Sequence, residues 1–575
     1  MSATGLKPES YRIVTSLIRV RGICSAHMKW FLWILALAAL VFTPRGVFAK
    51  GKAEHVVVVV WDGMRPDFIT PQHTPTLYDL AQRGAFFLNN RCAYITSTEV
   101  NGTVLATGMQ PDHSGVMANT QYRPDLNWQD TYGTESLDAV RRGDLLSNGH
   151  FLEAATIAEM LQEAGFATMI AGAKPVGLLH DRTFKKTTQA QKDSVTLFRG
   201  LTIPRSAMDS LTKSFEIGPF PGGEPPATPG TPSVGAMPTN APTGPGFRGP
   251  GSRTGDVNTV DSWTTKALVR GLWKKEVPKY SLLWLSEPDA SQHAHGVGSE
   301  EAVTALAGSD RNLALVIQTL ESKGVLDKTD IIVVSDHGFS TIDRGPEVME
   351  SLKRAKLNAF RQLQNPEPGD ILVVNLGGSS SFYVFDRDEA VIRKLVTHLQ
   401  GTDFAGVIFC ALPVEGTFPL SLVHLDVTNG APDVVVSMRW TAAINENGAP
   451  GAITAIEGKR GLGTHSSLSH FDLRNTLVAS GPDFKTGFVS GIPSGNIDVV
   501  PTVLSILGVC PPKPLDGRVL YEAMMGEVPP TAEPKEEKLE VTRDFGFRSW
   551  QQYLKFTRMG STVYFDEGNG GSRLK

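Results

Sequence analysis

A run of five consecutive valines restricts the fold of this chain more than any other feature. The segment His55–Trp61 reads His-Val-Val-Val-Val-Val-Trp and ends at Asp62-Gly63. A continuous β-branched run of this length is typical of a strand that is buried on both faces of a parallel sheet. Residues 74–85 then have the apolar spacing of a helix. A strand followed by a helix favours an α/β fold.

The alternation of helix and strand recurs along the chain. Helical spacing followed by an apolar strand pattern occurs at 155–165 then 167–171, at 257–273 then 280–285, and at 301–324 then 330–334. Successive units of this kind predict a doubly wound, mostly parallel sheet with helices on both faces. We expect residues 50–341 and 461–530 to form this domain. Residues 342–460 mix strand and helix patterns and predict a smaller inserted α+β cap.

Two segments have a composition of their own. Residues 218–255 are dense in Pro, Gly and Thr and have too few large apolar groups for a core, so we expect a surface insertion. In the tail, residues 531–575, apolar residues alternate with polar ones on both sides of Gly560-Ser561. This pattern predicts a β-hairpin, which we expect to dock on the main sheet.

The first 49 residues resemble a targeting segment. A lysine is followed by an apolar run of about a dozen residues and then by Val47-Phe-Ala49, which places small residues at the two cleavage-defining positions. We expect a signal peptide and therefore a secreted or periplasmic protein. The run is shorter than the roughly 20 residues of a membrane span, so an N-terminal anchor is the alternative only if cleavage fails. No other stretch is long and apolar enough to span a membrane.

Charge and cysteine content exclude some classes of function. The formal net charge is -4 over 575 residues, which gives no long-range attraction for nucleic acid. Removal of the N-terminal segment would leave Cys92, Cys410 and Cys510, whose spacing is not that of a metal site. The sequence does not indicate an oligomeric state.

Three predicted strands are followed by groups that can bind a metal ion. These groups are Asp62, Glu287-Pro-Asp289 and Ser335-Asp336-His337. Ligands bind at the carboxyl ends of the strands in open α/β sheets, so we expect these side chains to converge. Asp289 and His293 are four residues apart and would share one helical face, and oxygen with nitrogen ligands suits zinc or a similar divalent ion. His465, in a glycine-rich approach, could supply a further nitrogen.

A hydroxyl-rich stretch, Thr96-Ser97-Thr98, lies just before a predicted helix start. A threonine or serine hydroxyl is a poor nucleophile unless a base or a metal ion lowers its pKa. The strand-end groups could supply that activation. The residues alone leave all three hydroxyls as candidates.

Taken in order, these motifs resemble the type I phosphodiesterase/nucleotide pyrophosphatase family of the alkaline phosphatase superfamily. The resemblance is carried by Val-Val-Trp-Asp62-Gly, Thr98-Glu-Val-Asn101-Gly-Thr, Glu-Pro-Asp289-Ala-Ser-Gln-His293, Val-Ser-Asp336-His337-Gly and Gly-Thr-His465. It implies an alkaline phosphatase-like fold and a hydrolase that cleaves phosphodiester or pyrophosphate bonds of a small-molecule phosphate ester.

The resemblance also implies a role for each residue. One divalent ion, expected to be Zn²⁺, would be held by Asp289, His293 and His465. A second would be held by Asp62, Asp336, His337 and the oxygen of Thr98. Thr98 would be the nucleophile and would form a phosphothreonine intermediate, and Asn101 would donate a hydrogen bond to a non-bridging phosphoryl oxygen.

The sequence departs from the family pattern at several positions. Gln292 precedes His293 where the family has Gly, and Val100 precedes Asn101 where Pro is common. His465 is followed by Ser-Ser-Leu-Ser instead of Gly-Tyr-Asp, which leaves His470 as a rival ligand and weakens the case for nucleotide substrates.

Other activities are compatible with the same fold. They are those of a phosphomonoesterase, a phosphonate hydrolase and a sulfatase, although residues 95–108 contain no Cys/Ser-x-Pro-x-Arg motif of formylglycine sulfatases. A non-catalytic binding protein is the alternative of another class. The complete set of expected ligands argues against it.

Overall fold

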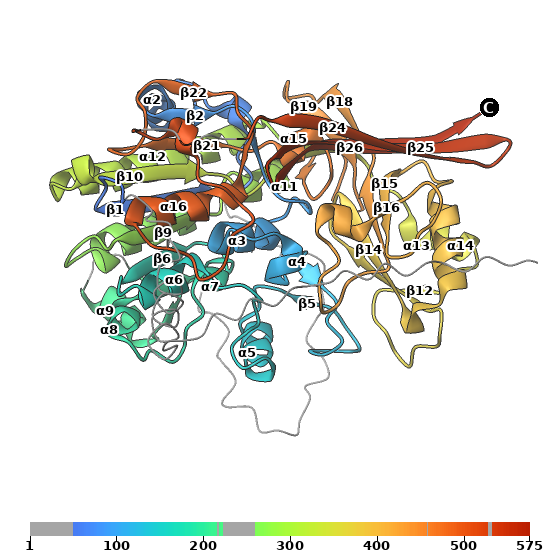
Figure 1. Cartoon of the computed structure of the whole chain (residues 1–575), viewed down its shortest axis with the longest axis horizontal. Helices are drawn as coiled ribbons and strands as arrows, with labels where there is room; N and C mark the ends of the chain where they lie inside the picture. The colour runs from blue at the N-terminus through green and yellow to red at the C-terminus, as the bar shows by residue number, and fades with distance from the viewer. Residues whose placement is uncertain (1–49, 215–217, 222–258, 457, 527–528, 530–531) are drawn as a thin grey trace, which may run out of the picture. The chain divides into compact units, whose positions relative to one another are not determined.

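The five-valine segment forms β1 (His55–Trp61), which lies in the middle of a nine-stranded sheet (Figure 1). The sheet order is β22 (Phe488–Ser490), β2 (Ala85–Phe87), β21 (Leu477–Ser480), β10 (Thr329–Val334), β1, β9 (Tyr280–Leu285), β6 (Thr168–Gly172), β7 (Val195–Phe198) and β8 (Leu201–Ile203). β10, β1, β9, β6 and β7 are parallel to their neighbours in this run, whereas β21 and β8 run antiparallel. The predicted α/β class with a mostly parallel sheet is confirmed.

This computed structural model describes residues 50–575 except 215–217, 222–258, 457, 527–528 and 530–531. The expected signal peptide and nearly all of the Pro/Gly-rich tract lie outside the described residues. Within the described part of the chain, no helix combines the length and the apolar character that crossing a membrane requires.

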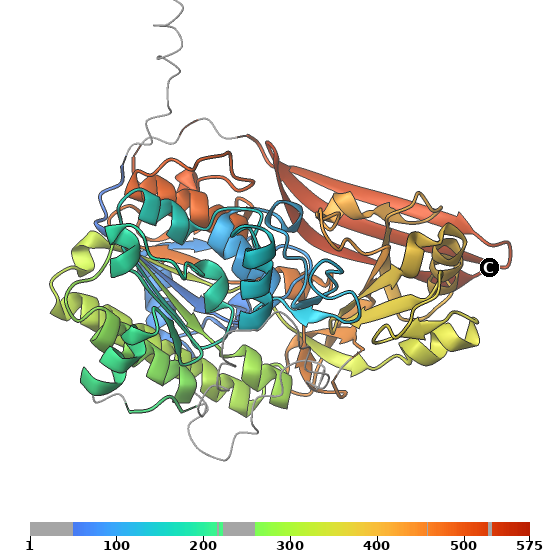
Figure 2. The ribbon, with the colours of Figure 1, turned by 90° about the horizontal axis from the view of Figure 1, so that it is seen from below.

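Alternate side chains of β1 face two separate hydrophobic cores. Val57 and Val59 pack in a core with α2 (Pro75–Arg83), α10 (Thr259–Lys266) and α12 (Glu300–Ser322). Val56 and Val58 pack in a core with α6 (Ile157–Glu163) and α16 (Val499–Leu507). Helices therefore cover both faces of the sheet, as Figures 1 and 2 show. Burial on both faces explains why the valine run does not alternate with polar residues.

A second sheet lies within the region predicted as a cap. Its six strands, in spatial order, are β12 (Ala359–Phe360), β13 (Ile371–Asn375), β14 (Ser379–Val384), β17 (Val434–Met438), β15 (Ala405–Cys410) and β16 (Phe418–Pro419). α13 (Val348–Arg354) and α14 (Glu389–Leu399) pack on it through Leu352, Ile392 and Leu395.

A four-stranded sheet joins this region to the α/β domain. It contains β18 (Trp440–Ile444), β19 (Pro450–Thr454), β11 (Ser340–Arg344) and β20 (Gly463–Thr464). β11 crosses the expected boundary at residues 341/342, and it pairs with β20, which follows the expected boundary at 460/461. Neither boundary is therefore a break between independent sheets.

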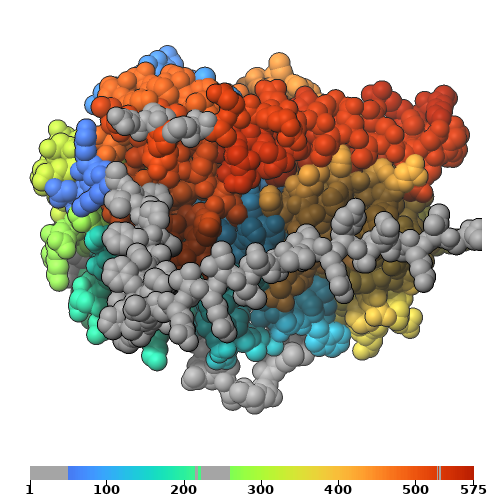
Figure 3. All heavy atoms as spheres, in the orientation of Figure 1, coloured from blue at the N-terminus to red at the C-terminus, as the bar shows by residue number. Residues whose placement is uncertain are grey.

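The C-terminal residues form a three-stranded sheet of β24 (Lys535–Asp544), β25 (Arg548–Met559) and β26 (Thr562–Leu574). β25 and β26 are the expected hairpin, and Gly560 in the turn has φ +60°. The docking differs from the expectation. Leu554, Phe556 and Phe565 share a hydrophobic core with Val407 and Phe409 of β15, so the hairpin packs against the second sheet and not on the main one (Figures 1 and 3). Alternation predicts that one face is buried but does not identify the surface that buries it.

Candidate metal centre

The three strand-end groups converge because their strands are neighbours. β1 pairs in parallel with β10 on one side and with β9 on the other, so that Val60 is level with both Val334 and Trp284. Asp62 follows β1, Asp289 follows β9 at the start of α11 (Asp289–His295), and Asp336 and His337 follow β10. Gly63 permits the close approach of the first two strand ends, since it has φ +72° and a Cβ there would lie 3.1 Å from the Cα of Asp289.

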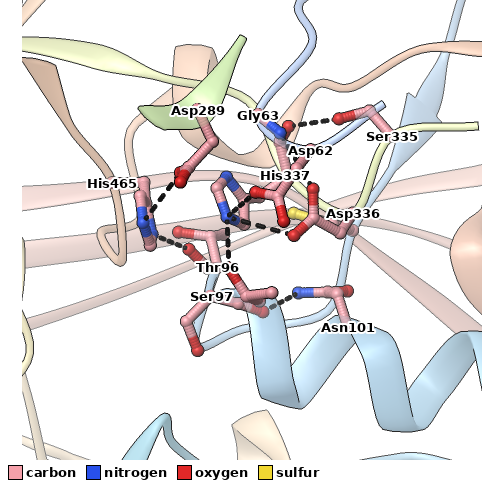
Figure 4. Close-up of polar contacts among 12 residues, drawn as sticks. Asp62, Gly63, Thr96, Ser97, Asn101, Asp289, Ser335, Asp336, His337 and His465 are labelled. Carbon is pink, nitrogen blue, oxygen red and sulfur yellow. Dashed lines mark hydrogen bonds and ion pairs between the residues drawn. The ribbon is translucent and has the colours of Figure 1, made fainter. Parts of the chain in front are cut away.

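The first ligand group contains Asp289, His293 and His465, whose ligand atoms all lie within 4.8 Å of one another. The Oδ1 of Asp289 is 3.4 Å from the Nε2 of His293 and 3.6 Å from the Nε2 of His465. Asp289 and His293 are one turn apart on α11, as their spacing predicts, and His465 follows β20. Figure 4 shows Asp289 and His465 facing each other.

The second ligand group surrounds the Nε2 of His337. This nitrogen is 3.2 Å from Asp336 Oδ2, 3.7 Å from Asp62 Oδ1 and 3.4 Å from the Oγ1 of Thr98. The ligand atoms of Asp62, Asp289 and His337 also lie within 4.8 Å of one another. The two groups are therefore adjacent, and Asp289 borders both.

Backbone carbonyls orient all three histidines in the same way. The Nδ1 of His293 is 3.0 Å from Gly463 O, that of His337 is 2.9 Å from Gly338 O, and that of His465 is 2.8 Å from Thr96 O. An Nδ1–H that donates to a carbonyl leaves Nε2 as the atom that can bind a metal. Burial lowers the pKa of His337 and holds the pKa of His465 well below its usual range, which favours the neutral imidazole that metal binding requires.

Each of the three carboxylates in the site has one oxygen that accepts a hydrogen bond and one that does not. Asp62 Oδ2 accepts from Trp284 Nε1 at 2.9 Å, and Asp336 Oδ1 accepts from the backbone N of Gly63 at 2.9 Å. The other oxygens, Asp62 Oδ1 and Asp336 Oδ2, are buried without a hydrogen-bond partner among the described residues, and so is Asp289 Oδ1.

Three buried carboxylates this close together require compensating positive charge. Burial, with a contribution from Asp336, raises the pKa of Asp62 well above its usual range, and burial raises the pKa of Asp336 to about 7. Unpartnered carboxylate oxygens beside imidazole nitrogens form a donor set that fits divalent cations such as Zn²⁺. The residues present therefore fit divalent metal ions.

The structure separates Thr98 from the other two hydroxyls. Thr98 is the first residue of α3 (Thr98–Thr107), and its Oγ1 lies beside His337. Thr96 Oγ1 instead donates to Ser467 O at 3.0 Å. Ser97 is the N-cap residue of α3, and its buried Oγ has no hydrogen-bond partner among the described residues. His470, at the start of α15 (His470–Leu473), belongs to neither ligand group, so His465 is the better candidate.

The expected role of Asn101 is not supported by its geometry. Its Nδ2 donates to the backbone oxygen of Ser97 at 3.3 Å (Figure 4) and to that of Ala93 at 3.1 Å, and its Oδ1 accepts from Ala93 N at 2.8 Å. Both amide hydrogens are therefore engaged, and none is left for a phosphoryl oxygen. Asn101 instead holds the loop before α3 in place.

Two polar side chains that the sequence reasoning missed approach the site. Asn119 Oδ1 accepts from the backbone N of Glu99 at 3.1 Å, which places this half-buried amide next to Thr98. Lys174 Nζ lies 2.6 Å from Asp289 Oδ2 and 2.9 Å from Asp62 Oδ2. Lys174 follows β6, so the rule that ligands gather at strand ends could have found it. Asn119 lies in a loop and has no comparable pattern.

Comparison with known proteins agrees with this arrangement. The family model described as type I phosphodiesterase / nucleotide pyrophosphatase matches residues 56–467, which include both ligand groups and Thr98. The chain belongs to this family.

Curated relatives match part of this chain. A venom phosphodiesterase of Macrovipera lebetinus is 25% identical over 213 residues, which are 37% of this chain and 23% of that protein. Ectonucleotide pyrophosphatase/phosphodiesterase family member 1 of Mus musculus is 26% identical over 243 residues, which are 41% of this chain and 24% of that protein. The matched region thus spans about a quarter of the length of these relatives.

Solved structures of the phosphodiesterase family share the fold. Human ectonucleotide pyrophosphatase / phosphodiesterase 5 superposes with a TM-score of 0.52 at 16% identity and covers 82% of this chain and 100% of its own. The murine protein, as an inactive threonine-to-alanine variant in complex with AMP, gives the same TM-score at 15% identity and the same coverage. At this identity the likeness concerns the fold alone.

Proposed function

We propose that this protein is a metal-dependent phosphoric-ester hydrolase that cleaves phosphodiester or pyrophosphate bonds, with Thr98 as the nucleophile. The observation that carries the proposal is the position of Thr98 Oγ1, 3.4 Å from His337 Nε2, at the start of α3 and beside two groups of metal-ligating side chains. The phosphodiesterase names of the relatives support this class of reaction.

Each ligand group would hold one divalent ion, and Zn²⁺ suits the mixture of carboxylate and imidazole. Asp289, His293 and His465 would hold one ion. Asp62, Asp336 and His337 would hold the other, together with the Thr98 oxygen. Ions bound there lower the pKa of a hydroxyl and stabilise negative charge on phosphoryl and leaving-group oxygens.

Hydrolysis would proceed in two steps through a phosphothreonine. Thr98 releases its proton to solvent, and its Oγ1 forms a bond to phosphorus in line with the leaving oxygen, whose bond to phosphorus breaks and which takes up a proton from solvent. Water then cleaves the phosphothreonine and restores the hydroxyl. The positive end of the α3 dipole lies beside Thr98 and favours an anionic phosphoryl group there. Asn119 takes the place that the sequence suggested for Asn101, as a donor to a non-bridging oxygen.

The substrate would be a small-molecule phosphate ester that reaches the protein outside the cytoplasm. The N-terminal apolar run supports export, and relatives include venom phosphodiesterases and ectonucleotide enzymes. Substrate choice would depend on the loops that surround Thr98.

The test compares bis-p-nitrophenyl phosphate, p-nitrophenyl phosphate and p-nitrophenyl sulfate as substrates of the zinc-loaded protein. We expect the diester to be hydrolysed, and Thr98→Ala to lose turnover while it keeps both metal ions. A lack of zinc-dependent turnover of either phosphate would refute the proposal. A pure binding protein would be indifferent to Thr98→Ala.

A further inference from the structure

Lys174 makes contacts that no other described cationic side chain makes. Its Nζ donates to Asp289 Oδ2 at 2.6 Å and lies 2.9 Å from Asp62 Oδ2. Asp289 belongs to the first ligand group, and Asp62 to the second. The side chain is 22% exposed and reaches the site from the residues after β6, which is paired with β9. One ammonium group therefore binds a carboxylate from each group.

The contacts divide the carboxylate oxygens into two kinds. Lys174 binds the Oδ2 atoms of Asp62 and Asp289, whereas the Oδ1 atom of each carboxylate has no hydrogen-bond partner within the described part of the chain. These Oδ1 atoms are the ones that face the histidine Nε2 atoms. A carboxylate can rotate to present either oxygen, so a donor fixed on one oxygen determines which is available to a metal ion.

The two carboxylates depend on Lys174 to different degrees. Asp62 Oδ2 has a second donor, Trp284 Nε1 at 2.9 Å, which would still orient the carboxylate without Lys174. For Asp289 Oδ2, Lys174 is the donor found among the described residues. The first ligand group should therefore respond more strongly to loss of the ammonium.

We propose that Lys174 is a positioning residue that orients one carboxylate of each ligand group and thereby links the two metal sites. The inference rests on the proposed metal centre and gives Lys174 no direct contact with the reacting atoms. It makes the occupancy of both sites depend on a single side chain.

Two physical effects of removing Lys174 have opposite signs, which makes the inference testable. Loss of a positive charge near the site would by itself strengthen the binding of a cation. Loss of the orienting hydrogen bonds would weaken it, and removal of such partners of metal ligands typically costs about 10–100-fold in metal affinity. The sign of the change therefore distinguishes a positioning role from simple charge compensation.

The experiment measures Zn²⁺ affinity by competition with a chromophoric chelator, and it needs no enzyme activity. The proteins are the wild type, Lys174→Met, Lys174→Gln and a control, Lys186→Met. Lys186 is also a poorly exposed lysine, 9% exposed and paired with Asp181 at 3.3 Å, but it does not touch the ligand groups.

We expect Lys174→Met to lose about 10–100-fold in Zn²⁺ affinity, with the larger loss at one of the two sites. Lys174→Gln, which keeps one N–H donor, should lose less, and Lys186→Met should match the wild type. Unchanged or tighter binding by Lys174→Met would overturn the inference. If Lys174→Met does not fold, Lys174→Gln decides, and wild-type or tighter Zn²⁺ affinity in Lys174→Gln would overturn the inference equally.

The same measurement separates this inference from the proposed function. A wild type that binds no zinc would overturn both. If zinc binds but no phosphate ester is hydrolysed, the proposed function fails, and the affinity comparison still decides the role of Lys174.

Discussion

Thr98 and Asn101 lie on the same helix, yet their side chains meet different surroundings. Thr98 Oγ1 faces the imidazole of His337, whereas the amide of Asn101 is bonded to the backbone of Ala93 and Ser97. A sequence motif places both residues at the start of α3 but does not define which of them faces the substrate. At this scale, function depends on which polar atoms are already satisfied by the protein.

Replacing Asn119 or Asn101 by alanine, one at a time, should distinguish the residue that binds the phosphoryl group from the one that supports the loop. Asn119→Ala should lower kcat/KM by about 10²-fold, because it removes a donor to the phosphoryl group, and should leave the fold stable. Asn101→Ala should lower the free energy of unfolding by about 1–3 kcal/mol, since it leaves buried backbone groups of the loop unpaired. Steady-state kinetics and urea unfolding of both variants check this. Normal stability with lost turnover in Asn101→Ala would restore the role expected from the sequence.

The rival histidines can be distinguished by metal content. His465→Ala should lose one bound metal ion per chain, because His465 Nε2 faces Asp289 Oδ1. His470→Ala should keep both, since the His470 ring packs 5.6 Å from that of Phe471 and lies outside the ligand groups. Elemental analysis of the two purified variants gives the answer. Loss of a metal ion from His470→Ala, but not from His465→Ala, would show that His470 is the ligand.

The elements bring the site together because three parallel strands end at the same edge of the sheet. At the opposite end of β10, two acidic side chains, Asp330 and Asp483, lie next to each other. Asp330 Oδ1 accepts from Asp483 N at 3.2 Å, and the Asp483 carboxylate accepts from the backbone N of Lys52 and Ala53. Burial and the neighbouring Asp483 raise the pKa of Asp330 to about 9. Asp330 is therefore protonated in the folded protein at neutral pH.

This raised pKa predicts how stability changes with pH. The folded pKa lies above the ordinary value, so the contribution of Asp330 to stability is complete below about pH 4 and declines as the pH rises toward about 9. Asp330→Asn is neutral at every pH. It should match the wild type near about pH 4 and melt at a higher temperature than the wild type above about pH 8.

Thermal melts across this range compare Asp330→Asn with the wild type. Asp327→Asn is the matched control, because it removes the same charge from an exposed position three residues earlier. A constant difference in melting temperature between Asp330→Asn and the wild type at all pH values would contradict the explanation.

Across the whole molecule, the sequence predicted the features that local patterns determine, and it did not predict those that depend on long-range contacts. β1 and β9 match their predicted ranges and β10 differs by one residue, because runs of apolar residues define buried strands locally. The convergence of Asp62, Asp289 and Asp336 was expected because each follows a predicted strand and ligands bind at the carboxyl ends of strands in open α/β sheets. The docking of β25 and β26 depends on contacts with residues far away in the chain, and the approach of Asn119 to Thr98 depends on the path of a loop. No local sequence pattern encodes either of them.

Removal of metal ions should affect the stability of the entire α/β domain. The buried carboxylates join β1, β9 and β10, so without cations their repulsion acts on the centre of the main sheet. Zinc at 1,000 times its dissociation constant would stabilise the fold by about 4 kcal/mol for one site. The melting temperature should therefore fall when a chelator is added and recover with excess zinc. No change on chelation would contradict the placement of the ions.

The central claim is that two metal ions and Thr98 act together in ester hydrolysis. Its most direct test is a titration of metal-free protein with Zn²⁺, in which bound zinc per chain and turnover of bis-p-nitrophenyl phosphate are measured on the same samples. The account predicts that turnover reaches its maximum at two bound ions per chain, and that Thr98→Ala binds two ions without turnover. Full turnover without bound metal, or in Thr98→Ala, would contradict it.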